Sequence, residues 1–234
     1  MCYLYAQNKK KILYLKDTKN NLSSDYHLIL DTFQDLPGIQ YTYHDGVTIQ
    51  QLYPKELTTF YEGLGIEVLK KEAKRIFQLQ PSVQTNVLSY RKGLPSFDLG
   101  IHIRSGDKIT TGEMKAIPFQ NYIDAIHRYQ TLFHKQTLSI YVMTDSTNAF
   151  KEVQKKADSS WTLFNIPSPI QNPNGHVQSS YNQMPSKQKM AAFHHFLAEL
   201  QILQQCPALL VTFSSNIGRF LRLTGTYEWI ESLD

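Results

Sequence analysis

The sequence predicts an α/β protein with a parallel sheet and helices on both faces. Short runs of apolar and β-branched residues alternate along the chain with stretches whose apolar residues recur at helical spacing. Polar clusters directly follow three of the predicted strands. Alternation of strand and helix is typical of a parallel sheet, because each parallel connection needs a crossover long enough to hold a helix. Ligands of such sheets bind at the carboxyl ends of the strands.

The first part of the chain contains fewer such signals. A strand is expected after the Lys9–Lys11 region and another after the Pro37-Gly38 turn, with two helices following, the second opened by Pro81. The expected strands are 11–15 and 39–43, and the expected helices are 66–79 and 81–91. Gly93, Leu94 and Pro95 then break the helical pattern. We therefore expect two domains, 1–92 and 93–234.

The second part alternates more clearly between strands and helices. Pro118 suits the start of a helix, Thr144-Asp145-Ser146 suits a helix cap, and Ser214-Ser215-Asn216 suits another. A polar loop is expected at 167–185, before a long amphipathic helix that starts at Ser186. The expected strands are 98–103, 138–143, 162–166 and 208–213.

Composition narrows the class of protein. The 234 residues are 41% hydrophobic and 19% charged, which is typical of a globular chain and excludes a disordered one. No apolar run reaches the roughly 18 residues of a membrane helix, and the start lacks the pattern of a secretory signal. The net charge of +4 is spread along the chain, so a nucleic-acid partner is not expected. Cys2 and Cys206 are expected to be free thiols in a reducing compartment.

Arg104 and the serines at 214 and 215 suggest an anion site. Arg104 directly follows an apolar strand, and a guanidinium donates two parallel hydrogen bonds to a phosphate. Ser214 and Ser215 are expected to begin a helix, where free N–H groups and the helix dipole favour an anion. Together these groups describe a diphosphate site. The alternative is a salt bridge from Arg104 to a carboxylate and a simple N-cap at Ser214.

Three charged residues lie in the loop after this strand. Glu113 suits a general base for a hydroxyl nucleophile, and its alternative is an exposed side chain in a mobile loop. Asp107 and Lys108 have the alternative of a solvated charged turn.

Several chemistries are not expected. No Asp-x-Asp pair is present to hold a metal on a diphosphate, and the P-loop and serine-hydrolase motifs are also missing. His194 and His195 lie within the long helix without ligand spacing, so we expect structural roles for them, one at the core edge and one toward solvent. No metal site is expected.

Three segments carry a resemblance. The segment 100–108, together with Glu113 and Pro118, resembles the first donor-site motif of the α-1,6-fucosyltransferase family. The segment 141–145 resembles that family's next strand end, and 209–216 with Arg219 resembles its last motif. The three occur in family order over about residues 80–225. The last motif does not fit the related α-1,2-fucosyltransferases, which carry aromatic residues after the serine pair.

The resemblance implies a catalytic domain that uses GDP-fucose with inversion and without a metal or other cofactor. Arg104 would bind the β-phosphate, assisted by Ser215, and Lys108 would lie near the diphosphate. Glu113 would be the base. The nucleoside would contact His102 and the guanine would be read by Glu199, whose carboxylate accepts from two adjacent N–H donors. The remaining donor-binding candidates are Asp145, Ser214 and Asn216.

The resemblance has departures. The family's second arginine is replaced by Ser105, and its Gly-rich loop has no counterpart before Lys11. The coiled-coil stem and SH3-like domain of the animal enzymes have no counterpart here either.

From these observations we expect a glycosyltransferase B-like fold of two Rossmann-like lobes, the first one shortened. Residues 1–92 would form the acceptor-side lobe and 93–234 the donor lobe. The expected reaction is transfer of L-fucose from GDP-β-L-fucose to a sugar hydroxyl of a glycan acceptor. The alternatives are a non-catalytic GDP-sugar or glycan-binding module and a transferase for another GDP-sugar. The expected location is cytoplasmic, or the Golgi lumen if an anchor lies outside this chain.

Overall fold

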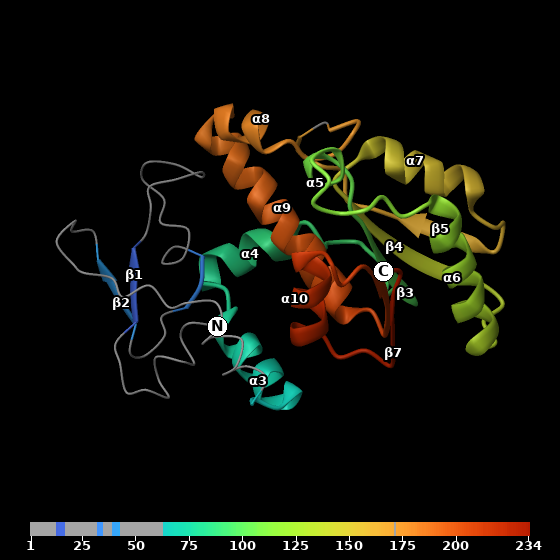
Figure 1. Cartoon of the computed structure of the whole chain (residues 1–234), viewed down its shortest axis with the longest axis horizontal. Helices are drawn as coiled ribbons and strands as arrows, with labels where there is room; N and C mark the ends of the chain where they lie inside the picture. Colours follow the sequence, from blue (N-terminus) through green and yellow to red (C-terminus); the bar gives the residue numbers. More distant parts are fainter. Residues whose placement is uncertain (1–12, 17–31, 35–38, 43–62, 171) are drawn as a thin grey trace. The chain divides into compact units, whose positions relative to one another are not determined.

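The computed structural model describes residues 13–16, 32–34, 39–42, 63–170 and 172–234 (Figure 1). The chain divides into two compact units, Met1–Gln84 and Thr85–Asp234. The domain boundary expected at residue 92 stays a prediction. Cys2 and the Lys9–Lys11 run lie outside the described residues.

The first unit contains a small parallel sheet and helical segments. Strands β1 (Leu13–Lys16) and β2 (Ile39–Thr42) pair in parallel, with Leu13 opposite Ile39. Helix α3 (Ile66–Ile76) starts where the sequence predicts and ends three residues earlier than expected. Helix α4 (Pro81–Ser89) begins in this unit and continues into the second. The positions Lys11, Ile12 and Tyr43 of the predicted strands lie outside the described residues.

The second unit is built on a five-stranded parallel sheet, which confirms the predicted α/β class. The strand order is β5-β4-β3-β6-β7. From β3 the chain moves outward through β4 and β5 and then returns to β6 on the other side of β3. The order of strands therefore reverses between β3 and β6, and a crevice for a ligand opens at such a point. The strands are β3 (Leu99–Ile103), β4 (Leu138–Thr144), β5 (Trp161–Phe164), β6 (Ala208–Val211) and β7 (Trp229–Ser232).

Helices cover both faces of this sheet (Figure 1). Helices α6 and α7 pack against one face, and α9 with α10 covers the other. Pro118 is the N-cap of α6, and Ser146 caps α7 by accepting a hydrogen bond from the N–H of Ala149, as the sequence predicts. The helices are α5 (Asp107–Thr110), α6 (Phe119–Leu132), α7 (Thr147–Lys156), α8 (Gln178–Gln183), α9 (Ser186–Gln205) and α10 (Asn216–Thr224).

Alternate residues of β3 serve the two faces. Leu99, Ile101 and Ile103 join the core under α6 and α7. Gly100 lies on the α9 face, where an added Cβ would be 2.5 Å from a methyl of Leu203. The absence of a side chain there allows α9 to approach the sheet closely. The same alternation places His102 on the α9 face at the end of β3.

Three short elements were not predicted. Helix α8 lies inside the segment expected to be a polar loop, and α5 lies in the turn after β3. Both are too short and polar to show a helical apolar pattern. Strand β7 is a half-buried edge strand of four residues. The strand expected at 162–166 forms one residue earlier and is shorter than predicted.

The structure also bears on the predicted free cysteines and on membrane-spanning helices. Cys206 is a free thiol, and its burial raises its pKa to about 12. In the described part of the chain, no helix is both long enough and apolar enough to cross a bilayer.

Candidate functional site

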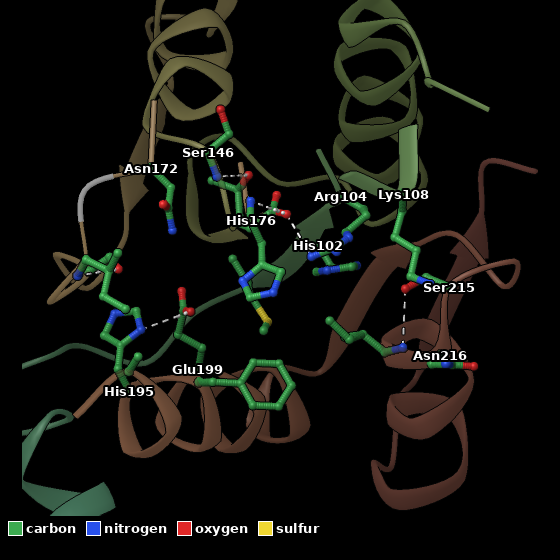
Figure 2. Close-up of a pocket in the computed structure, with 18 of the residues that line it drawn as sticks. His102, Arg104, Lys108, Ser146, Asn172, His176, His195, Glu199, Ser215 and Asn216 are labelled. Atoms are coloured by element: carbon green, nitrogen blue, oxygen red, sulfur yellow. Dashed lines mark hydrogen bonds and ion pairs between the residues drawn. The ribbon is translucent and has the colours of Figure 1, made fainter. Parts of the chain in front are cut away.

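A cavity of about 630 Å³ opens at the carboxyl ends of β3, β4 and β6. All the site residues predicted from the sequence line it, although they come from five separate segments. In Figure 2, His195 and Glu199 of α9 lie on one side, Ser215 and Asn216 on another, and His102 and Arg104 between them. The predicted residues that line the cavity are His102, Arg104, Lys108, Glu113, Asp145, Glu199, Ser214, Ser215 and Asn216.

Arg104 lies at the end of β3 and is held by two carboxylates. Its Nη1 donates to Asp145 Oδ2 at 2.7 Å, and its Nη2 donates to Asp107 Oδ1 at 3.1 Å. The salt bridge that the sequence left as an alternative is therefore present. A guanidinium carries five N–H groups, so these two bonds orient Arg104 without using all of its donors.

The carboxylate of Asp145 joins three segments. Besides Arg104, it accepts hydrogen bonds from the N–H of Ser105 at 2.8 Å and of His176 at 3.1 Å. It therefore ties the ends of β3 and β4 to the loop that follows β5. Its bonds to the protein indicate a positioning role in the cavity wall.

Two glycines bring the loop after β3 against the loop at 172–178. Gly106 has φ +72° and Gly175 has φ +100°, a backbone region that residues other than glycine rarely adopt. The N–H of Gly106 donates to Asn174 O at 3.1 Å, and that of Asp107 donates to His176 O at 2.9 Å. An added Cβ on Gly106 would lie 2.6 Å from the nitrogen of His176. The close backbone approach therefore requires glycine at this position.

Asp107 is more than a solvated turn residue. Its carboxylate accepts from the Gln178 N–H at 3.0 Å in addition to Arg104. Partial burial raises the pKa of Asp107, but the Gln178 bond and the Arg104 charge outweigh burial, and the net pKa is lowered. Asp107 is therefore ionised at neutral pH.

Lys108 and Glu113 form an ion pair at the rim of the cavity. Both side chains are about half exposed, and Thr111 Oγ1 also donates to Glu113 at 3.3 Å. The hydrogen bond from Lys108 lowers the pKa of Glu113. Glu113 is therefore an ionised carboxylate at neutral pH, although the adjacent cation weakens it as a base.

The turn after β6 differs in detail from the prediction. Helix α10 begins at Asn216, and its N-cap is Ser215, whose Oγ accepts from the Ile217 N–H. Ser214 precedes the cap, and its N–H is already donated to Asp234 Oδ2 at 2.8 Å. The expectation of a free N–H at Ser214 is therefore wrong, because the chain's last residues fold back onto this turn. Among the described residues, the N–H groups of Asn216 and Gly218 have no hydrogen-bond partner.

Glu199 lies deep in the cavity and is almost fully buried. Burial raises the pKa of Glu199 well above its usual value, although the bond from the Tyr141 hydroxyl, at 3.3 Å, opposes this. Its second oxygen lies 3.4 Å from His195 Nδ1. This carboxyl group is therefore the one in the cavity that is most easily kept neutral when no ligand is bound.

His102 is buried beside Arg104. Burial, and then the charge of Arg104, lower the pKa of His102 to about 3, so the ring is neutral at physiological pH. Its Nδ1 is buried without a partner in the described part of the chain. A polar atom in this state is well suited to a hydrogen bond with a ligand.

Solved structures resemble this chain, whereas no family profile and no curated protein matches its sequence. A NodZ α-1,6-fucosyltransferase crystal soaked with GDP-fucose matches with a TM-score of 0.58 and 12% identity, over 96% of this chain and 86% of NodZ. NodZ co-crystallised with GDP matches with a TM-score of 0.61 and 12% identity, over 99% and 88%. Fucosyltransferase NodZ from Bradyrhizobium matches with a TM-score of 0.59 and 11% identity, over 96% and 86%.

The chain has a fucosyltransferase-like fold. This confirms the predicted resemblance and the glycosyltransferase B-like class. The structural match extends beyond the residues 80–225 that carry the sequence motifs.

Several residues lining the cavity of this fucosyltransferase-like fold were not selected from the sequence. Asn172 and His176 belong to the segment expected to be a polar loop, and no local pattern marks them. Of the two histidines expected to be structural, His195 is buried and lines the cavity, whereas His194 is half-buried. Arg219 was part of the last motif and also lines the cavity. Its position one helical turn after Ser215 was the available signal.

Among the residues that the structure describes, no group of three or more histidine, cysteine or acidic side chains is arranged to hold a metal ion.

Proposed function

We propose that this protein is an inverting glycosyltransferase that moves L-fucose from GDP-β-L-fucose to a hydroxyl of a glycan acceptor without a metal ion. One observation carries the proposal. A single cavity holds Arg104 and the start of α10 at the point where the strand order reverses, and a buried carboxyl group, Glu199, on α9. The likeness of the fold to NodZ, which was studied with GDP and GDP-fucose, supports the same function.

The diphosphate of the donor binds between β3 and α10. Arg104 offers the N–H groups that Asp107 and Asp145 leave free, and those carboxylates hold its plane in one orientation. Asn216 is the first residue of α10 and lines the cavity, and its N–H lies where the helix dipole favours an anion.

Charge balance gives Arg219 a part in this binding. Two carboxylates already offset the charge of Arg104, and Glu113 offsets that of Lys108. The guanidinium of Arg219 instead contacts neutral groups, Asn216 Oδ1 at 2.6 Å and Ser214 O at 3.5 Å. Its uncancelled charge in the cavity wall compensates for Ser105, which stands where the resembling family has a second arginine.

The guanine binds at the opposite end, against Glu199. Guanine presents N1–H and N2–H as adjacent donors, and the two oxygens of a carboxylate accept both. His102 contacts the nucleoside through its unpartnered ring nitrogen. Asp145 acts on the donor through Arg104.

The transfer is a single displacement. The acceptor oxygen bonds to C1 of fucose from the face opposite the diphosphate while the bond from C1 to the β-phosphate oxygen breaks, so the configuration at C1 inverts. The proton of the acceptor hydroxyl passes to Glu113, and GDP leaves with the bonding electron pair. Arg104, Lys108 and the start of α10 stabilise the charge that grows on the leaving diphosphate.

Calorimetric titration tests the donor site. GDP, UDP and GDP-fucose are titrated into the protein without added metal, and then into Arg104→Lys and Arg104→Ala. We expect saturable binding of GDP and GDP-fucose that UDP does not reproduce. Arg104→Lys keeps the charge but loses the forked geometry, and we expect it to weaken binding. In a separate transfer assay we expect Arg104→Ala to lower kcat by roughly 100-fold to 1,000-fold, because it removes a preorganised donor from the leaving diphosphate.

Arg128→Ala is the matched control. Arg128 forms an exposed ion pair with Glu231 and does not line the cavity. An unfolding curve for each variant separates lost binding from lost structure. Full kcat in a folded Arg104→Ala protein would contradict the role assigned to Arg104, and equal binding of UDP and GDP would contradict the guanine site.

A second candidate is a GDP-sugar-binding module without turnover. The ion pair with Lys108 favours this alternative, because it lowers the pKa of Glu113 and so weakens the proposed base. The module would bind GDP-fucose but release no GDP with any glycan acceptor. GDP release in the presence of an acceptor excludes it, and GDP-mannose tested beside GDP-fucose separates a fucosyltransferase from a transferase of another GDP-sugar.

A further inference from the structure

His195 and Glu199 form a buried pair one helical turn apart on α9. Nδ1 of His195 lies 3.4 Å from Oε2 of Glu199, and both residues are at least nine-tenths buried (Figure 2). None of the three sequence motifs includes His195. The chemistry of the pair follows from what lies on the other side of the imidazole ring.

The opposite ring nitrogen determines the tautomer. Nε2 of His195 lies 3.1 Å from the backbone carbonyl oxygen of Ile166. A carbonyl oxygen only accepts, so the hydrogen bond requires a proton on Nε2. In a neutral imidazole Nδ1 is then an acceptor, and it faces a carboxyl oxygen. Two acceptors at 3.4 Å attract each other only when a proton lies between them, so this contact favours one proton on the pair.

The surroundings decide which partner carries that proton in the empty cavity. Burial raises the pKa of Glu199 and lowers that of His195, so both are driven toward the neutral state. Facing Glu199 are the Tyr141 hydroxyl from β4, which donates to Oε1, and the charge of Asp145, which disfavours a second carboxylate. The edge of the Tyr90 ring packs on His195 at a centroid distance of 5.7 Å and brings no charge. The empty pair is therefore Glu199 as the acid and His195 as the neutral base.

We infer that His195 is a positioning residue that takes the Glu199 proton when guanine binds, so that the cavity selects guanine without losing a proton to solvent. The inference rests on the proposed function, because it assigns the Glu199 end of the cavity to the base. Guanine N1–H and N2–H donate to the Glu199 oxygens, and the proton on Oε2 passes to Nδ1. Glu199 becomes a carboxylate and His195 an imidazolium. The proton count of the pair does not change.

The pair also explains discrimination between bases. A carboxylate accepts two donors, whereas adenine presents one donor beside a nitrogen lone pair that would face the second oxygen. Uracil presents a single N–H between two carbonyl groups. Only the ionised form of Glu199 matches both guanine donors, and His195 makes that form available in a buried site.

The proton count on binding tests the inference. GDP-fucose is the probe, because the terminal phosphate of GDP itself titrates near pH 6. Binding is measured by calorimetry between pH 5.5 and 8 in two buffers of different ionisation enthalpy. For the wild-type protein we expect no proton exchange and a dissociation constant that does not vary with pH. For His195→Leu, Glu199 must release its proton to solvent, so we expect release of one proton and affinity that rises about tenfold per pH unit while free Glu199 stays protonated.

His194→Leu is the matched control. His194 is the neighbouring histidine on α9 and does not line the cavity, so this variant should retain the proton count of the wild type. A merely structural role for His195 would lower the affinity of His195→Leu at every pH without proton release, and that result overturns the inference.

Nitrogen NMR of the imidazole rings tests the pair without a ligand. In the free protein we expect His195 as the neutral tautomer with a proton on Nε2 between pH 6 and 8, and protons on both nitrogens after GDP-fucose is added. A free ring protonated on Nδ1, or one unchanged by the ligand, overturns the inference while the proposed function stands. Failure of GDP-fucose to bind to the wild-type protein overturns both.

Discussion

Nη1 of Arg104 donates to Oδ2 of Asp145 at 2.7 Å across the ends of two neighbouring parallel strands. The register explains the contact, because Ile103 at the end of β3 pairs with Thr144 at the end of β4. The residues that follow them, Arg104 and Asp145, therefore lie next to each other. The same carboxylate receives the N–H groups of Ser105 and His176, so the orientation of Arg104 and the position of the 172–178 loop depend on one side chain.

Asp145→Asn is expected to weaken this corner of the cavity. The amide loses the charge that holds Arg104 and keeps one acceptor oxygen for the three donors. We expect a loss of roughly 1–3 kcal/mol in the free energy of unfolding, and weaker GDP-fucose binding because Arg104 loses its orientation. Urea unfolding and calorimetry measure the two effects. Asp124→Asn on the exposed surface of α6, where Asp124 bonds Gln120, is the control. Equal stability and affinity in the two variants would contradict the positioning role.

The acid limb of the transfer rate is expected to depend on Lys108. The hydrogen bond from Lys108 lowers the pKa of Glu113, so the carboxylate stays ionised to a lower pH than an isolated glutamate. The rate of fucose transfer should therefore stay constant as the pH falls from neutral, and should decrease only when the pH drops through the lowered pKa of Glu113. Lys108→Met removes the cation, returns the pKa upward, and moves the acid limb to higher pH.

Release of GDP from GDP-fucose, measured from pH 4 to 8 with an acceptor, reports the limb separately from the size of kcat. Glu113→Gln is the companion variant, and it should bind the donor but transfer nothing at any pH. An acid limb at the same pH in Lys108→Met would assign the base to another residue.

Gly106→Ala and Gly112→Ala form a matched pair. Both glycines have positive φ, +72° and +75°, so alanine is strained at each, and Gly106 also has ψ −150°, a region that is essentially restricted to glycine. A Cβ on Gly112 points into open space, whereas one on Gly106 meets the backbone of Gly175 and His176. We expect Gly106→Ala to lose at least about 1–3 kcal/mol more stability because the two loops must separate. Equal unfolding midpoints in urea would show that the close approach does not matter.

Ser215→Ala and Ser214→Ala separate the cap of α10 from its neighbour. The Ser215 hydroxyl accepts from the Ile217 N–H at 3.2 Å, and loss of such a cap costs about 0.5–2 kcal/mol. The Ser214 side chain instead hydrogen-bonds the Asp234 carboxylate on the exposed side of the turn, outside the cap, so we expect alanine there to cost less stability than loss of the cap. Thermal unfolding compares them. The assignment of the cap would be wrong if Ser214→Ala were the less stable variant.

Much of the second unit was predictable from local patterns. Strands β3 and β4 and the long helix α9 each show a local pattern of apolar residues. Helix α7 likewise has its capping residue, Ser146, directly before its first turn. The location of the site followed from one rule, because polar residues after parallel strands meet at one edge of the sheet. His102, Arg104, Asp145 and Ser215, which follow or end these strands, all line the cavity, whereas Asp107 from the same cluster does not.

Interactions between distant segments were not predictable. The hydrogen bond from the Ser214 N–H to the Asp234 carboxylate depends on the final strand, β7, whose four residues carry no pattern of their own. Likewise, His176 enters the cavity because two glycine-containing loops cross, and a single sequence does not reveal that crossing.

The sequence by itself determined the order of the strands β3 to β6 and of the longer helices between them, the parallel sheet and the polar residues at its edge, because these depend on neighbours a few positions apart. Only the tertiary structure decided which charges meet. Arg104 pairs with carboxylates 3 and 41 positions away, and His195 donates to a carbonyl 29 positions away. The protonation of Glu199 is likewise a tertiary property, because burial and the direction of the His195 ring exist only after α9 packs on the sheet.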